Sequence, residues 1–372
     1  MPHQTIVKVT APSEPRSMTA EERALHELTH LPYHPGCPEC VAGRGRDAAH
    51  LSTSESSPQP ITPVIQCDYC SPTEESASGE KHRIAVFVAV DQARGVYFPT
   101  PVQRKGSADT HAATAFANWI LELGYNKLAI QPDKEHSARD LLKSAVAKTR
   151  LSAEIASPEQ ISQRVSPESS HQSNGAAERA CGMVEGMFRT SRATLEKKLG
   201  TKLPLTHNIF LFLVQYVGWS LTHFQRKQAT GLTGFEAVHL KKYKSDVLPF
   251  GDAVLAREPG VFLHKAVSRW HEGVWIGRSP VSDEHMVLTQ ERGLLLCRTI
   301  KRLVPEQQFL LSRFSFPRTP WKTQSVMPGR PVRAAAAATP LMASQATGSA
   351  ASAAPGDNPS SVLPALVIFV FS

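Results

Sequence analysis

The sequence has few cysteines and no long apolar run. Six cysteines in 372 residues are too few for a disulfide scaffold. The opening stretch "MPHQTIVKVTAPSEPRS" contains no apolar segment, so no signal peptide is expected. The closing stretch "VLPALVIFVFS" is apolar but shorter than the roughly 20 residues that a membrane-spanning helix needs. We therefore expect neither a disulfide-stabilised extracellular protein nor a membrane partner.

Positive charge is in excess. Lysine and arginine number 41 against 33 aspartates and glutamates, which gives a formal net charge of +8. A surplus of this sign suits an anionic partner such as nucleic acid. The apolar content of 41% is enough for an ordinary hydrophobic core, and the length allows two domains with tails.

Composition divides the chain into six parts. Stretches rich in Ser, Pro, Ala and Gln separate segments with regular apolar spacing. The expected parts are a disordered N-terminus at 1–20, a His/Cys module at 21–50, a linker at 51–60, an α/β core at 61–240, a small β-rich basic module at 241–315 and a disordered tail at 316–372.

The core segment shows both strand-like and helix-like patterns. Strands are predicted at 61–70, 82–92, 94–102, 126–133 and 150–157. Helices are predicted at 107–124, 137–149, 175–200 and 206–224. Ser107 or Asp109 would cap the first helix, and Gly124 would end it. This order predicts a mixed α/β layer fold.

The pattern changes after about residue 250. Short strand candidates at 251–260, 273–280, 284–293 and 294–305 are separated by Gly and Pro, which predicts a small β-barrel or sheet. Trp270 and Trp275 are expected to be core residues there. The neighbouring lysines of "HLKKYKSD" could contact a DNA backbone or form a solvated face, and the sequence does not separate these readings.

Three acids occur at the points where a metal-dependent catalyst would need them. Asp68 lies in the first strand, Asp133 at the end of the strand segment 126–133, and Glu178 at the start of the helix that begins within "HQSNGAAERA". Neighbouring strands and a helix packed on them could bring the three carboxylates together. Carboxylates that converge repel one another unless cations neutralise them, and oxygen ligands suit Mg²⁺ or Mn²⁺. Each acid alone reads as an ordinary surface carboxylate.

A compact group of histidines and cysteines precedes the core. In "HELTHLPYHPGCPEC", His26 and His30 are one helical turn apart, and Cys37 and Cys40 form a Cys-x-x-Cys turn. Imidazoles and thiolates select tetrahedral Zn²⁺, so the spacing predicts a structural zinc site. His34 could replace His26 as a ligand.

A rival zinc site would join the two Cys-x-x-Cys pairs of the chain. Cys67 and Cys70 are three residues apart in a predicted strand, so their side chains should point to opposite faces. We therefore disfavour a four-cysteine site, although free thiols at Cys37 and Cys40 stay an alternative.

The acids in their local contexts carry a resemblance. Asp68, Asp133 and Glu178 with "SNGAAERA", after a His/Cys cluster, resemble the Asp-Asp-Glu integrase core of retroelements, which has a ribonuclease-H-like fold. The stretch "TGFEAVHLKKYKSDVLPFGDAVLA" is similar to the segment after that core in copia-type retrotransposon polyproteins. The resemblance covers roughly residues 25–304. The gap between Asp133 and Glu178 is longer than in retroviral integrases.

The resemblance implies a DNA integrase. Asp68, Asp133 and Glu178 would hold two Mg²⁺ or Mn²⁺ ions, and Asn174 would position DNA or the active-site helix. The implied reactions are trimming of the element's DNA ends and strand transfer to target DNA. A homo-oligomer that acts in the nucleus after cytoplasmic assembly is implied as well. The alternatives are a catalytically inactive nucleic-acid-binding relic and a ribonuclease-H-type nuclease. The closing apolar run raises the further hypothesis of an interrupted reading frame.

Overall fold

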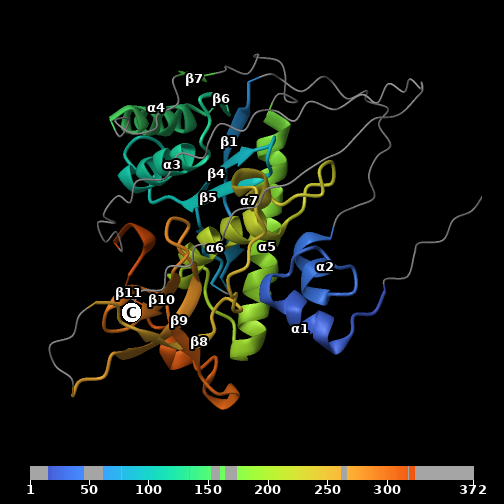
Figure 1. Cartoon of the computed structure of the whole chain (residues 1–372), viewed down its shortest axis with the longest axis vertical. Helices are drawn as coiled ribbons and strands as arrows, with labels where there is room; N and C mark the ends of the chain where they lie inside the picture. The colour runs from blue at the N-terminus through green and yellow to red at the C-terminus, as the bar shows by residue number, and fades with distance from the viewer. Residues whose placement is uncertain are drawn as a thin grey trace, which may run out of the picture. The chain divides into compact units, whose positions relative to one another are not determined.

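The computed structural model describes residues 16–45, 62–76, 78–133, 135–151, 160–163, 174–260, 266–316 and 318–322 (Figure 1). The linker expected at 51–60 lies outside these residues, as do most of the two expected disordered ends. Within the described residues, no helix is both long and apolar enough to cross a membrane.

A five-stranded mixed sheet forms the first layer. Its strands are β1 (Val64–Cys70), β4 (Val86–Asp91), β5 (Val96–Pro101), β6 (Lys127–Pro132) and β7 (Gln160–Gln163), in the order β5-β4-β1-β6-β7. β1 runs antiparallel to β4 and parallel to β6. All six residues of β4 are buried, as the apolar run at 82–92 predicted. The predicted mixed α/β sheet is confirmed.

The last strand of this sheet corrects one prediction. The segment 150–157 was expected to be a strand, but Leu151 is the last residue of helix α4 (His136–Leu151), and 152–159 lie outside the described residues. β7 begins further on, at Gln160. The apolar periodicity of α4 continues to Leu151, and neither Gly nor Pro occurs there to mark the end of the helix. The pattern alone could therefore not locate the boundary between helix and strand.

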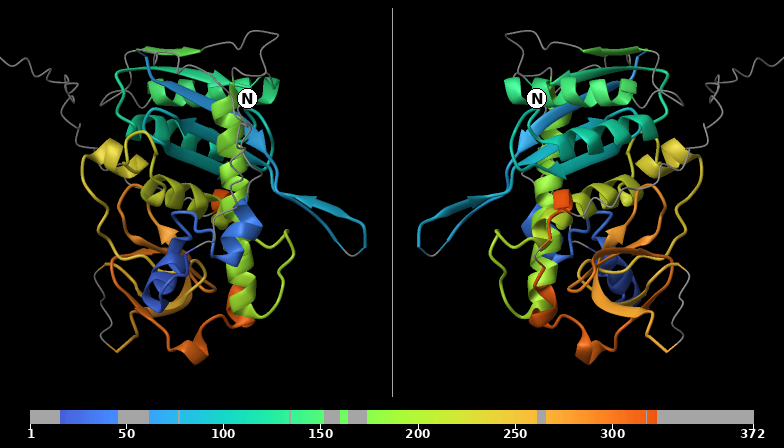
Figure 2. Two further views of the ribbon diagram at one scale, coloured as in Figure 1. Left: turned by 90° about the vertical axis from the view of Figure 1, so that its right-hand side faces the viewer. Right: turned by 90° about the vertical axis from the view of Figure 1, so that its left-hand side faces the viewer.

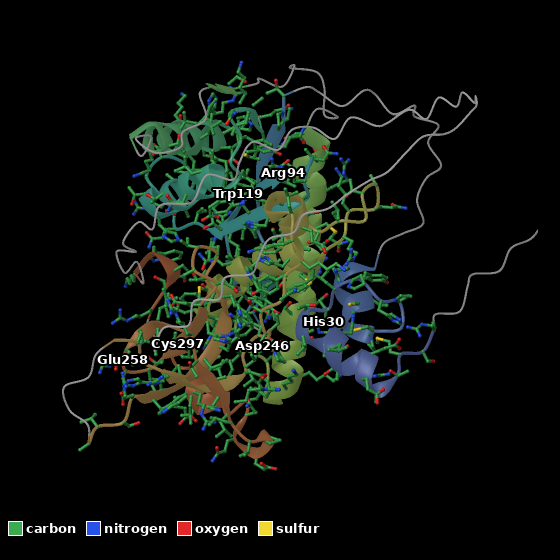
Figure 3. All side chains as sticks on the ribbon, viewed as in Figure 1. His30, Arg94, Trp119, Asp246, Glu258 and Cys297 are labelled. Atoms are coloured by element: carbon green, nitrogen blue, oxygen red, sulfur yellow. The ribbon has the colours of Figure 1, made fainter. Side chains whose placement is uncertain are left out.

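Helices cover both faces of the sheet. α3 (Thr110–Glu122) and α4 share one apolar core with Phe87, and this core contains Phe116 and Trp119 (Figure 3). α5 (Gly175–Leu199) and α6 (Ile209–Phe224) share the other core with alternate residues of β4, including Val86 and Val88. Because side chains alternate along a strand, the same strand serves both cores.

Local chemistry sets the helix ends that the sequence predicted. Asp109 is the N-cap of α3, and its carboxylate accepts the N–H of Ala112 at 2.9 Å. Gly124 follows the end of α3 with φ of 64°, and Gly200 ends α5 with φ of 66°, a left-handed conformation that favours glycine. α7 (Gly234–His239) follows α6 and starts with a capping box at Thr233.

A second, antiparallel sheet follows in the chain. Its strands are β8 (Ala253–Arg257), β9 (Trp270–Arg278), β10 (His285–Thr289), β11 (Gly293–Cys297) and β12 (Ile300–Arg302), in the order β11-β10-β9-β8-β12. The segment 294–305 thus supplies two strands instead of one. Short 3₁₀ turns lie at η2 (Pro305–Gln307), η3 (Leu311–Phe314) and η4 (Pro320–Lys322). Trp275 is fully buried, as expected, and its ring lies 6.0 Å from that of Tyr216 in α6.

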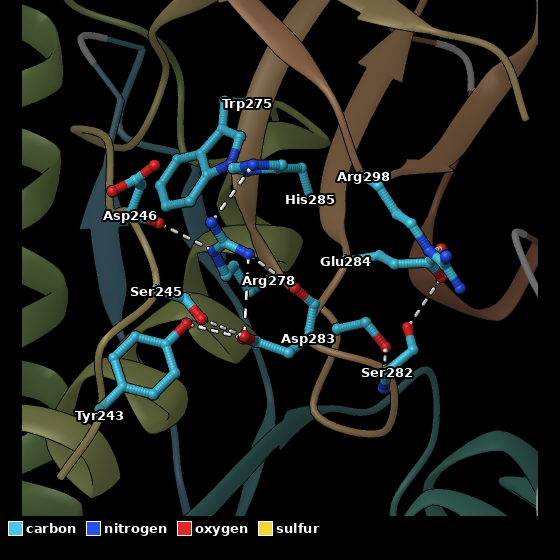
Figure 4. A network of polar contacts seen from close by, with 11 residues as sticks. Tyr243, Ser245, Asp246, Trp275, Arg278, Ser282, Asp283, Glu284, His285 and Arg298 are labelled. Carbon is cyan, nitrogen blue, oxygen red and sulfur yellow. Dashed lines mark hydrogen bonds and ion pairs between the residues drawn. The ribbon is translucent and has the colours of Figure 1, made fainter. Parts of the chain in front are cut away.

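A buried arginine joins this sheet to the segment before it (Figure 4). The guanidinium of Arg278 donates to the backbone carbonyl of Asp246 at 2.8 Å and to that of Asp283 at 2.6 Å. The carboxylate of Asp283 accepts the hydroxyl of Tyr243 at 2.7 Å. Beside it, the indole N–H of Trp275 donates to Nδ1 of His285 at 3.1 Å. The network fixes the segment 243–246 against the turn between β9 and β10.

The N-terminal helices pack against α5. α1 (Ala20–Thr29) begins with a capping box at Thr19, and α2 (Pro38–Arg44) follows after a short loop. The side chain of Arg189 in α5 donates to the carbonyl of Gly43 at 2.9 Å. The remaining strands, β2 (Thr73–Glu75) and β3 (Lys81–Arg83), form a hairpin that projects from the rest of the fold (Figure 2).

We expect Gly43→Ala to destabilise the fold by about 1–3 kcal/mol, because added volume at a tight contact forces neighbours apart. A Cβ at Gly43 would overlap Oγ1 of Thr190 and lie 2.8 Å from the backbone carbonyl oxygen of Gly186. Chemical denaturation would measure the loss. Gly182→Ala on α5 is the control, because a Cβ there meets nothing within 4 Å. Equal stability of the two variants would contradict the close approach of α2 to α5.

The imidazole of His285 should make stability depend on pH. Burial, with the nearby Arg278 charge, lowers its pKa from 6.5 to about 4. Between these values the unfolded chain binds more protons, so the free energy of unfolding should fall by roughly 1–3 kcal/mol as pH drops from 7 to 4. The contribution is fully present above pH 6.5. Denaturation midpoints across this range should fall less steeply for His285→Gln, and an unchanged slope would refute the assignment.

Candidate functional site

The first two acids lie on neighbouring strands of the sheet. Asp68 is in β1, and Asp133 directly follows β6, the parallel neighbour of β1. The backbone N–H of Asp133 donates to the carbonyl of Cys67 at 2.9 Å, which continues the ladder by one residue. The hydrogen bonding of the sheet therefore holds the backbone of Asp133 beside that of β1, one residue before Asp68.

The third acid comes from the first turn of α5. Glu178 lies in that turn, and two side-chain contacts fasten the turn to β1. The side-chain oxygen of Gln66 accepts the N–H of Ala176 at 2.9 Å and that of Ala177 at 3.3 Å. These are N–H groups that a helix start leaves without intrahelical partners. Gln66 and Asp68 are two apart in a strand and share a face, so the contact brings α5 over the face that carries Asp68.

Sequence reasoning missed Gln66. An amide in a strand carries no local signal of its own. Its position two residues before Asp68 was the only available clue, because residues at this spacing point to the same face.

Asn174 contacts the strand directly. It is 5% exposed, and its Nδ2 donates to the carbonyl of Cys67 at 3.3 Å. Its Oδ1 is buried and has no hydrogen-bond partner among the described residues. Of the two roles predicted for Asn174, this contact favours positioning of the helix. A role in DNA binding stays a prediction.

The electrostatics of Asp68 show that the acids sense one another. Burial, together with the negative charges of Asp133 and Glu178, raises its pKa to about 6, against a hydrogen bond from the N–H of Tyr69 that lowers it. Bound cations would relieve this repulsion. The arrangement could thus hold divalent metal ions through oxygen ligands.

The acid group is wider than a single-ion site. Within the described residues, the ligand atoms of these three acids do not all lie within 4.8 Å of one another. Two ions roughly 4 Å apart need ligands spread over a larger span than one ion does. The spread is compatible with two ions and does not fit one ion that all three carboxylates contact.

Glu135 is a fourth acid near Asp68 that sequence reasoning did not select. Its carboxylate contributes to the raised pKa of Asp68. Both of its oxygens lie 2.9 Å from Nζ of Lys105, and this partner lowers the pKa of Glu135 despite its partial burial. The ion pair gives Glu135 a counter-charge of its own.

The predicted His/Cys residues form one cluster. His26, His30, Cys37 and Cys40 are all buried, and their ligand atoms all lie within 4.8 Å of one another. Nδ1 of His30 lies 3.6 Å from Sγ of Cys37 and 3.8 Å from Sγ of Cys40, while Nε2 of His26 lies 3.3 Å from Sγ of Cys40. Tetrahedral zinc with usual bond lengths would separate nitrogen and sulfur ligands by about 3.6 Å. The four side chains therefore fit a zinc ion.

The alternatives for this site fare less well. Nδ1 of His34 accepts the N–H of Gly36 at 3.0 Å, and His34 is not in the four-residue group. Cys67 belongs to the core under α3, whereas Cys70 belongs to the core under α5. The two thiols of the second pair thus point to opposite faces of the sheet and do not reach the cluster.

The two thiols of the cluster differ in acidity. Burial raises the pKa of Cys37 to about 12. Burial acts in the same direction on Cys40, but the neighbouring side chains of His26, His30 and Arg44 outweigh it and lower the pKa of Cys40 to about 4. The guanidinium of Arg44 lies 3.2 Å from Sγ of Cys40. The lowered pKa favours the thiolate form of Cys40, which is the form that binds metal.

Comparisons with known proteins give structural neighbours only. No protein-family model matches the sequence, and no curated protein matches it. One neighbour is a chain of the cryo-EM structure of a simian T-cell lymphotropic virus intasome in complex with PP2A regulatory subunit B56 gamma. It has 14% identity and a TM-score of 0.34, over 71% of this chain and 87% of that chain.

A second neighbour is the crystallised catalytic core domain of BIV integrase. It has 15% identity and a TM-score of 0.27, over 48% of this chain and 95% of that chain. The structural neighbours are thus retroviral integrase structures. Both TM-scores lie below 0.5, so the function proposed for this chain rests on its own side chains.

Proposed function

We propose that this chain is a retroelement integrase of the copia type, a polynucleotidyl transferase with a ribonuclease-H-like catalytic core. The observation that supports the proposal is the placement of three acids on neighbouring elements of the fold. Asp68 comes from β1, Asp133 from the end of β6, and Glu178 from the first turn of α5. The mutual effect of their charges on the pKa of Asp68 supports a shared cation site.

The chain's own residues would supply position and charge. Asp68 and Asp133 are held by the hydrogen bonds of adjacent strands, and Glu178 by a helix start that Gln66 fastens. Two bound Mg²⁺ or Mn²⁺ ions would stabilise the attacking and leaving oxygens of a phosphodiester. The new P–O bond forms to a water or DNA hydroxyl oxygen while the bond to the leaving oxygen breaks. No protein nucleophile is needed.

DNA is the proposed substrate, as element ends and as target. The net charge of +8 and the exposed side chains of Lys241, Lys242 and Lys244 support contact with a phosphate backbone. A homo-oligomer, action in the nucleus and assembly in the cytoplasm belong to the same proposal and follow from the family resemblance alone.

The proposal assigns structural zinc to the N-terminal module. His26, His30, Cys37 and Cys40 would hold it, and their distances to one another support a tetrahedral site. The described part of the module, residues 21–45, has the two helices α1 and α2, so a bound ion would supply cross-links that so small a core lacks.

The cation site predicts a change in stability that needs no DNA. Asp68→Asn removes one of the repelling charges, so the variant without divalent ions should melt about 2 °C or more above the wild type at pH 7.5. Mn²⁺ should raise the melting temperature of the wild type and have a weaker effect on the variant. Thermal melts with and without Mn²⁺ would measure both effects.

The matched control is Asp140→Asn, which changes an exposed acid on α4. Its response to Mn²⁺ should equal that of the wild type. An Asp68→Asn variant that responds to Mn²⁺ as fully as the wild type would remove Asp68 from the cation site.

Strand transfer tests the function itself. Glu178→Gln keeps the shape of the side chain but removes a metal-binding charge, so joined product should fall by at least about 100-fold, the scale expected when a group that stabilises the transition state is lost. In the assay, purified protein would be incubated with Mg²⁺ or Mn²⁺, a duplex that carries the element's terminal sequence and a plasmid target.

Glu185→Gln, two turns further along α5, is the control and should keep activity. Joined strands indicate an integrase, whereas cleaved fragments alone indicate a nuclease. Wild-type protein that binds DNA and Mn²⁺ yet forms no product would favour the inactive relic.

A further inference from the structure

The zinc cluster has a neighbour on α5. Nε2 of His30 lies 2.7 Å from the hydroxyl oxygen of Thr194. Figure 3 shows His30 between the N-terminal helices and α5. His30 is 3% exposed, so water does not compete freely for its ring nitrogens. The contact joins residues 164 positions apart in the chain.

The hydroxyl of Thr194 has only one hydrogen to donate, and a backbone carbonyl of α5 accepts it. The carbonyl of Thr190, one turn earlier in α5, lies 2.9 Å from Oγ1 of Thr194 and accepts its hydrogen. Toward His30 the oxygen can then act only as an acceptor. Nε2 of His30 must therefore carry the proton, which leaves the lone pair on Nδ1.

Nδ1 is the ring nitrogen that faces both thiols. It lies 3.6 Å from Sγ of Cys37 and 3.8 Å from Sγ of Cys40. A neutral imidazole binds a metal ion through its unprotonated nitrogen, and the hydrogen bond of the other nitrogen decides which one that is. The contact with Thr194 thus selects the tautomer that the cluster needs.

We propose that Thr194 is a positioning residue of the zinc site, which fixes the tautomer and ring orientation of His30. The backbone of His30 is held separately. Its N–H donates to the carbonyl of His26 at 2.6 Å, and its carbonyl accepts from Arg44. These contacts act on the main chain and not on the ring. Thr194 supplies a hydrogen bond to the ring itself.

The site therefore includes α5 as well as the N-terminal module. Lys197, one turn after Thr194, pairs with Glu39 at 2.7 Å, and Glu39 lies between the two cysteines in sequence. The helix that carries Glu178 thus also shapes the metal cluster. This inference rests on the proposed zinc module. It assigns part of the zinc affinity of that module to Thr194, a residue of the catalytic core.

The test is zinc affinity, measured by competition with a coloured chelator on the full chain. Thr194→Val keeps the shape of the side chain and removes the acceptor, so zinc should bind about 10- to 100-fold more weakly. Thr194→Ser keeps the hydroxyl and should bind within about threefold of the wild type. The absorption of Co²⁺ in the site, a readout of ligand geometry, should change in Thr194→Val and be restored in Thr194→Ser.

Thr114→Val on α3 is the control, because the hydroxyl of Thr114 also donates to a carbonyl one turn earlier, but α3 packs on the opposite face of the sheet from α5. It should bind zinc as the wild type does. If wild-type protein binds zinc and Thr194→Val binds it equally, the role of Thr194 is overturned and the zinc module stands. If Thr194→Ser is as weak as Thr194→Val, packing and not the hydroxyl matters, which also overturns it. Wild-type protein that binds no zinc would overturn the zinc module itself.

Discussion

The side-chain oxygen of Gln66 accepts two N–H groups at the start of α5, and this contact decides where the helix meets the sheet. Nearby, the carbonyl of Cys67 accepts both the N–H of Asp133 and the side-chain amide of Asn174. Two adjacent residues of β1 therefore hold the start of α5 and the residue after β6. These hydrogen bonds place Asp133 and the first turn of α5, which carries Glu178, beside β1. The three carboxylates themselves take no part in them.

This arrangement places mutually repelling carboxylates in a part of the fold that buried strands and apolar cores stabilise. Burial and the other acids raise the pKa of Asp68 to about 6, so ionisation of this carboxyl group costs more free energy than usual when no cation is bound. The flanking strand β4 is completely buried, and both faces of the sheet carry large apolar cores. A local electrostatic cost can persist where surrounding contacts over-determine the backbone, and such sites are commonly functional.

The sequence predicted features whose cause is local. Gly200 ends α5 because a left-handed residue favours glycine, and the buried run of β4 was visible as a β-branched apolar stretch. Spacing in the sequence also predicted that four residues form a metal site: His26, His30, Cys37 and Cys40. Gln66 and Thr194 could not be predicted, because each acts on a residue more than 100 positions away, and neither side chain is unusual in its own segment. The roles of the three acids stay predictions, since convergence alone does not show metal binding.

One helix serves two proposed metal sites, and its geometry limits how they can influence each other. Glu178 and Thr194 are 16 residues apart in α5, or roughly 24 Å along the axis and about 160° around it. Charges that far apart at the surface interact weakly, because the screening length in physiological salt is about 8 Å. Zinc cannot tune the acids through its field. Any influence must pass through the contacts of the N-terminal module with α5, such as the close approach of Gly43 to Thr190 and the contact of His30 with Thr194. It would thus act through the stability and register of the helix.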